Sequence, residues 1–84
     1  MAQTTGFVQL LIVKTDAACA WIGASPTNVE VLSIIATSND TATTLAFKSG
    51  MVNALSAAMA GRRQVVATHG DSDATITKVQ VNPA

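Results

Sequence analysis

The feature that most constrains this chain is a single helical segment, residues 45–60, with strand-like sequence on both sides of it. Apolar side chains recur there at three- and four-residue intervals, which places Met51, Val52 and Leu55 on one helix face. Alanine and leucine dominate the segment and proline is absent, so intrinsic propensity also favours a helix. We therefore predict one helix near residues 45–60, with Val52 and Leu55 in the core.

The residues that flank this segment are typical of helix ends. A hydroxyl of Thr43 or Thr44 is expected to accept a hydrogen bond from a free amide of the first turn. Gly61 is predicted to take the left-handed conformation that commonly follows a helix. Arg62 and Arg63 suit the negative end of the helix dipole.

The opposite face of the predicted helix carries small, uncharged side chains where a surface helix normally carries charges. Such a face lets another backbone come close, as between packed subunits, but it also occurs as an ordinary solvent face. The low charge of the whole chain favours the subunit contact. The predicted interface residues are Ser49, Asn53, Ser56, Ala57 and Ala60.

Five short runs rich in apolar and β-branched residues predict strands, three before the helix and two after it. The first run is apolar on both alternating sides, so we expect both of its faces to be covered. The predicted strands are residues 7–14, 17–22, 29–36, 64–68 and 74–81, and the predicted loops are residues 23–28, 37–44 and 69–73. A short edge hairpin around Asn39 and Asp40 is the alternative for residues 37–44. Residues 1–5 are polar and are expected to form a lead-in.

The last strand breaks strict alternation, because Ile76 and Val79 lie three positions apart. A β-bulge between them would return Ile76, Val79 and Val81 to one inward face.

The order β-β-β-α-β-β predicts a mainly β domain with one helix, and it is the element order of the OB-fold, a small five-stranded barrel. A chain of 84 residues suffices for one domain with a single core, residues 1–84. A three-stranded sheet with the helix on one face and an added hairpin is the alternative architecture. A single helix excludes the ferredoxin-like βαββαβ order.

The second half of the chain contains a Phe-Lys start, a Met/Leu/Ala helix, a Gly-basic exit, a short strand and a closing Ile-x-x-Val-x-Val strand. The positions of this pattern are Phe47, Lys48, Met51, Leu55, Ala58, Gly61, Arg62, Val65, Val66, Ile76, Val79 and Val81. With them the chain resembles small OB-fold subunits related to the pentameric B-subunits of bacterial toxins. The resemblance is compositional and implies a ring of subunits with helices toward the centre, often with sugar binding. Unlike secreted toxin subunits, this chain has no cysteine pair for a disulfide.

Charged residues make up only 12% of the chain, about half of the roughly 25% in an ordinary soluble domain. That deficit favours association with further copies of the chain. Five cationic and five anionic side chains give a net charge of zero, which disfavours nucleic acid as a partner. No apolar run approaches the roughly 20 residues of a membrane-spanning helix.

The chain offers little reactive chemistry. Its one cysteine, Cys19, would need a nearby base to stabilise a thiolate, and only His69 is available, so a buried structural role is favoured. His69, Asp71 and Asp73 are possible metal ligands, but turn formation explains that stretch better, because neither a zinc nor a calcium pattern is complete. We predict no enzymatic activity, no catalytic residue, no metal and no cofactor.

Trp21 is the residue best suited to stack against a sugar or a base, although packing in the core or at an interface is the favoured role. The loop that follows it, residues 23–28, is the first place to expect a ligand. The predicted ligand-binding residues are Trp21, Ser25, Thr27 and Asn28.

These observations predict a non-enzymatic, ring-forming binding or structural module, most simply a homo-pentamer, with a glycan as a subordinate ligand class. The alternatives are an OB-fold binder of single-stranded nucleic acid and a structural component of a phage or another assembly. The first residues show no positively charged signal-peptide region, so a cytoplasmic protein is expected, or a secreted one whose signal peptide has been removed.

Overall fold

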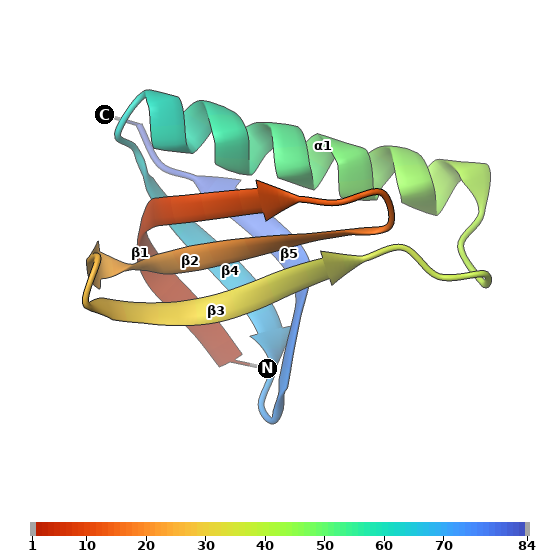
Figure 1. Cartoon of the computed structure of the whole chain (residues 1–84), viewed down its shortest axis with the longest axis horizontal. Coiled ribbons are helices and arrows are strands. Elements are labelled where there is room, and N and C mark those ends of the chain that lie inside the picture. The colour runs from red at the N-terminus through yellow and green to blue at the C-terminus, as the bar shows by residue number, and fades with distance from the viewer. Residues whose placement is uncertain (1, 84) are drawn as a thin grey trace.

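The computed structural model describes residues 2–83 as five strands and one helix in the predicted order (Figure 1). The fold class is thus confirmed: the domain is mainly β, with an OB-fold-like closed barrel and one helix. The elements are β1 (Ala2–Val13), β2 (Ala17–Ser25), β3 (Asn28–Ile35), α1 (Ala42–Ala60), β4 (Gln64–Gly70) and β5 (Asp73–Val81).

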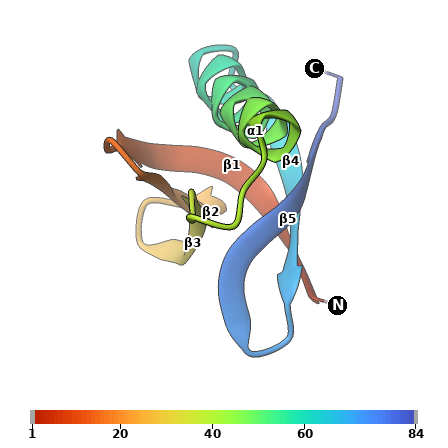
Figure 2. The same ribbon diagram turned by 90° about the vertical axis from the view of Figure 1, so that its right-hand side faces the viewer.

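The strands close in the order β1-β2-β3-β5-β4, and β1 belongs to both sides of the barrel. Its residues 2–7 pair with β4 and its residues 7–13 pair with β2, both antiparallel. Among the described residues, β3 and β5 share a single parallel ladder position, Ser33 opposite Thr75. Figure 2 shows this sparse seam, where β5 curves away from β3 below the helix.

The expected polar lead-in is wrong, because residues 2–5 form the start of β1. Their pairing with β4 supplies hydrogen bonds that the sequence alone does not reveal, since the partner strand lies about sixty positions further along the chain. The loop predicted at residues 23–28 is likewise shorter than expected. Strands β2 and β3 run up to Ser25 and Asn28, which leaves only Pro26 and Thr27 in the turn.

Two glycines explain how the strands extend so far. A Cβ on Gly23 would lie 1.9 Å from the carbonyl oxygen of Asn28, and one on Gly6 would lie 2.7 Å from the backbone of Gly23. At both positions the neighbouring backbone is too close for any side chain. The two glycines therefore let β1, β2 and β3 pass close together at this corner of the barrel.

The predicted bulge in the last strand is confirmed. Thr68 pairs with Lys78 and His69 with Ile76, so Thr77 is the extra residue, and its hydroxyl donates to the carbonyl oxygen of Thr68 at 3.2 Å. Ile76 is buried and Val79 packs against the core. Val81 pairs with the buried Val65 but remains exposed, so the inward face does not extend to the strand end. The turn after β4 is shorter than predicted, and His69 lies within β4.

Helix α1 lies across one end of the barrel and contacts β1 and β5 most extensively (Figure 2). Leu55 is fully buried and Val52 packs partly buried against the core, as predicted. The apolar stripe does not continue to the helix start, where Leu45 and Phe47 are exposed. The buried core comprises Val8, Ala20, Ile22, Leu32, Ile34, Leu55, Ala58, Val65, Ala67 and Ile76.

Both helix ends differ in detail from the prediction. The N-cap is Thr41, whose side-chain oxygen accepts a hydrogen bond from the backbone amide of Thr44. In return, the hydroxyl oxygen of Thr44 accepts a hydrogen bond from the backbone amide of Thr41. This reciprocal capping box starts the helix three residues earlier than expected.

At the other end, Gly61 has φ −88° and the left-handed residue is Arg62, with φ 55°. The amide of Arg63 donates to the carbonyl oxygen of Ala58 at 2.9 Å and that of Arg62 to Met59 at 3.4 Å. These are the bonds of a Schellman motif, in which glycine usually takes the left-handed position. The amide of Gly61 donates to the carbonyl oxygen of Ala57 at 2.9 Å, and a Cβ on Gly61 would lie 3.3 Å from that oxygen.

Candidate functional site

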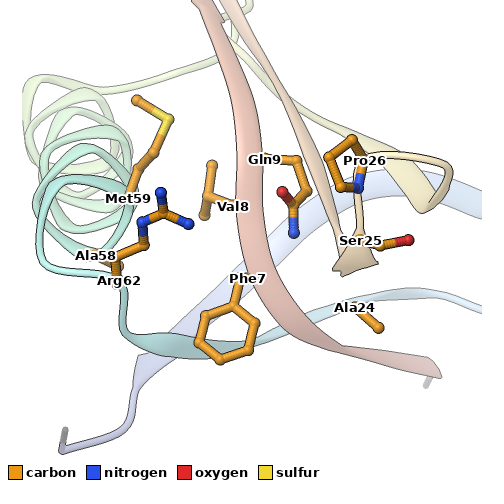
Figure 3. A pocket seen from close by; sticks show the side chains of 9 residues that line it. All are labelled: Phe7, Val8, Gln9, Ala24, Ser25, Pro26, Ala58, Met59 and Arg62. Atoms are coloured by element: carbon orange, nitrogen blue, oxygen red, sulfur yellow. The ribbon is translucent and has the colours of Figure 1, made fainter.

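A cavity of about 740 Å³ lies where the end of α1 meets β1 and the β2–β3 turn (Figure 3). Three segments that are distant in sequence form this cavity, so no single stretch of the chain predicts it. None of its lining residues is acidic. They are Phe7, Val8, Gln9, Ala24, Ser25, Pro26, Ala58, Met59 and Arg62.

Arg62 provides the charge of this cavity. Figure 3 shows its side chain beside Met59 and Val8, with the Phe7 ring nearby and on the same side of β1. Within residues 2–83, the guanidinium of Arg62 makes no hydrogen bond and no ion pair. An arginine side chain stays protonated at physiological pH, so the cavity carries an unpaired positive charge.

The opposite wall of the cavity is polar and neutral. The Gln9 amide nitrogen donates to the carbonyl oxygen of Gly23 at 3.1 Å, which turns the Gln9 side chain toward the β2–β3 corner. The Ser25 hydroxyl lies 3.3 Å from that of Thr27. The site therefore combines one cation, hydroxyl and amide groups, and the exposed apolar surface of Phe7 and Met59.

Three of the predicted ligand residues lie together at the β2–β3 turn, where Ser25 pairs with Asn28 and its hydroxyl is close to that of Thr27. Trp21 lies further back along β2. Of the four, only Ser25 lines the cavity. Phe7, Gln9 and Arg62 were not predicted as ligand residues, because only the folded barrel brings them to the loop. The one available signal was the position of Arg62 directly after a helix end.

Trp21 lies on the outside of the barrel, half buried, paired with Leu10 of β1 and Val31 of β3. The next row along the same face has Cys19 between Ile12 and Ser33. We call this surface the apolar outer face and define it as Leu10, Ile12, Cys19, Trp21, Val31 and Ile35.

The apolar outer face is uncovered in the single chain. Leu10 is 48% exposed and Val31 is 46% exposed. The expectation that both faces of the first strand are covered therefore fails for one chain by itself. The expected burial of Cys19 is wrong too: the residue is half buried on this outer face, and its sulfur lies 3.8 Å from the hydroxyl oxygen of Ser33. The register places it outward because its neighbours Ala18 and Ala20 point into the core.

The five predicted interface residues all lie exposed on α1. The only charged residue of this helix is Lys48. Its ammonium group donates to the Asp40 carboxylate at 2.8 Å and to the carbonyl oxygen of Ile35 at 2.6 Å. The bond from Lys48 is the main cause that lowers the pKa of Asp40, followed by a bond from the backbone amide of Thr37. The rest of the helix surface is therefore uncharged.

A second polar cluster closes the far end of the barrel. The Thr4 hydroxyl donates to the Glu30 carboxylate at 2.7 Å and lies 3.0 Å from Nε2 of His69. Nδ1 of His69 lies 2.8 Å from the carbonyl oxygen of Gly70 and 3.2 Å from that of Asp73, so Nδ1 carries a proton. The cluster joins β1, β3 and β4 beside the sparse β3–β5 seam, and its buried Thr4 and His69 indicate a structural role.

The acidic residues near His69 do not converge on a cation position. The Asp73 carboxylate accepts a bond from the backbone amide of Thr75 at 2.9 Å, and this bond is the main cause that lowers the pKa of Asp73. Across residues 2–83, no three His, Cys, Asp or Glu side chains lie together in an arrangement that could hold a metal ion.

Within the same described part of the chain, α1 does not combine the length and the apolar character that a membrane-crossing helix needs. No protein-family model matches the sequence, and no curated protein or solved structure is significantly similar to it.

Proposed function

We propose that this chain is a non-enzymatic module that assembles with copies of itself into a closed ring. One observation carries the proposal: a single molecule exposes two different uncharged surfaces, the apolar outer face and the small-residue face of α1. Burying either surface against another copy would leave no unpaired charge behind, and burial of apolar area is the main favourable term in association.

The position of the two surfaces supports a ring over a simple dimer. They lie on different elements, so one copy can present its sheet to the helix of the next. Contacts between unlike patches are heterologous and close into a ring when the rotation allows it. The single β3–β5 ladder position also leaves strand edges that a neighbour can pair with.

The start of α1 offers a further contact. Figure 1 shows that this end of the helix extends beyond the barrel. Phe47 is 72% exposed there and Leu45 is 40% exposed. Neither side chain belongs to the buried core cluster of the single chain, and a neighbouring copy could cover their exposed parts.

Native mass spectrometry and light scattering at micromolar concentration test the proposal. The expected mass is a multiple of 8.6 kDa, with the pentamer as the specific expectation. A monodisperse mass near 8.6 kDa would refute self-assembly. A stable dimer would keep self-association and reject the ring. A glycan array on the assembled protein tests the subordinate ligand class.

A further inference from the structure

We propose that the cavity beside Arg62 binds a small organic carboxylate, with its charged group on the guanidinium and its apolar part against Phe7 and Met59. The cavity lies within one chain, so this proposal does not depend on assembly. Three observations carry it: the backbone conformation of Arg62, the absence of a partner for its side chain, and the composition of the cavity wall.

The backbone conformation of Arg62 is costly. Its φ of 55° lies in the left-handed region, which side chains with a Cβ adopt only with strain. Glycine fits this position of the Schellman motif without strain, yet the glycine at this helix end, Gly61, lies one residue earlier and has φ −88°. Strained residues cluster at functional sites, and here the strained residue supplies the only charge in the cavity.

The guanidinium is available to a ligand. It has no hydrogen-bond or ion-pair partner among residues 2–83, and no acidic side chain lines the cavity. The planar fork of donors on arginine matches the two oxygens of a carboxylate.

The wall composition narrows the ligand class. Phe7 is 40% exposed and Met59 is 37% exposed, so the same cavity presents an aromatic ring and a thioether to the ligand. A single cation beside apolar surface suits one carboxylate joined to an apolar or ring group. A phosphate would gain little, since the adjacent cation, Arg63, does not line the cavity.

The test is a titration of the folded protein with benzoate, monitored by backbone amide NMR. Benzyl alcohol is the neutral probe of similar shape and inorganic phosphate is the anion without a ring. We expect saturable benzoate shifts that centre on Phe7, Gln9 and Arg62, with affinity at least about tenfold higher than for either control probe, as expected for a charge-assisted contact. Equal affinity for benzyl alcohol or phosphate would overturn the proposal.

Variants of the two neighbouring arginines separate a binding role from a structural one. Arg62→Gln should weaken benzoate binding by about tenfold, whereas Arg63→Gln, the matched control, should change it by less than about twofold. Arg62→Gly should abolish binding and at the same time raise Tm by about 4 °C, because it relieves the strain. Benzoate affinity that survives in Arg62→Gly, or that falls equally in Arg63→Gln, would contradict the assignment.

Discussion

The two halves of the barrel both have apolar side chains on the inside, but their outward-facing side chains differ in polarity. One half consists of β2, β3 and residues 8–13 of β1, and the other of β4, β5 and residues 2–7 of β1. In the first half, the outward row across the strands is Leu10, Trp21 and Val31. In the second half, the equivalent row is Thr5, Val66 and Gln80.

This difference shows that the inward and outward alternation of side chains along a strand does not determine whether the outer face of the sheet meets water or another surface. Both halves turn alternate side chains into a common core, where Leu32 and Val65 are each buried almost completely. Only the second half, which we call the polar half, has an exterior suited to water. The first half, which we call the apolar half, has the composition of a strand covered on both faces.

The largest expected effect comes from the core that both halves share. Leu55 is fully buried and connects α1 to the barrel. Leu55→Ala should cost about 2–5 kcal/mol of unfolding free energy, because it removes buried methyl groups and leaves a cavity. Urea denaturation measures this cost, and a loss below about 0.5 kcal/mol would mean that the helix does not pack through Leu55.

The second prediction tests the exteriors against each other. Val31→Lys places a charge on the apolar outer face, while Thr5→Lys places the same charge on the outer face of the polar half. The first variant should shift the native mass toward 8.6 kDa, since association would bury an unpaired charge. The second should leave the mass unchanged. If both variants keep the wild-type mass, the apolar outer face is not the interface.

On the helix side of the proposed contact, Ser56→Arg should also disrupt or expand the proposed ring. Copies around one axis would then bring like charges together. Light scattering of the variant against the wild type measures the change, and an unaltered mass would remove this helix face from the interface.

The sequence predicts what depends on local pattern and misses what depends on distant partners. A short stretch of sequence is enough to show the periodicity of apolar residues. That periodicity predicts the element order, the bulge at Thr77 and the burial of Leu55. The start of β1 does not, because its polar residues become a strand only by pairing with β4. The cavity around Arg62 was missed for the same reason, since three separate segments form it.

The fourth prediction concerns the connection from α1 into the polar half. Arg62→Gly should raise the unfolding free energy by about 1 kcal/mol, because glycine adopts positive φ without a steric penalty. Gly61→Ala is the contrasting change and should destabilise, since its Cβ would crowd the Ala57 carbonyl oxygen at 3.3 Å. Urea denaturation of the two variants should give opposite signs. Destabilisation by Arg62→Gly would show that the side chain of Arg62, not strain, dominates there.

The smallest effect is expected from the ion pair beside the apolar half. Lys48 binds Asp40, whose carboxyl pKa is lowered from 3.8 chiefly by that bond. A carboxyl group with a lowered folded-state pKa stabilises the protein above its unfolded pKa of about 3.9, and this contribution is lost as the pH falls through the folded pKa. Asp40→Asn should therefore lower Tm at pH 7, and the difference from the wild type should shrink as the pH falls below about 4.

Asp16→Asn is the matched control for this measurement. Asp16 is exposed in the β1–β2 turn, and its side chain has no hydrogen-bond or ion-pair partner among residues 2–83. The control should leave Tm at pH 7 close to that of the wild type. A deficit for Asp40→Asn that persists unchanged at pH 2 would show that the effect does not come from the charge of Asp40, and it would remove the ion pair from the account. The helix would then depend on the apolar half through packing alone, with Lys48 as a solvated charge at its edge.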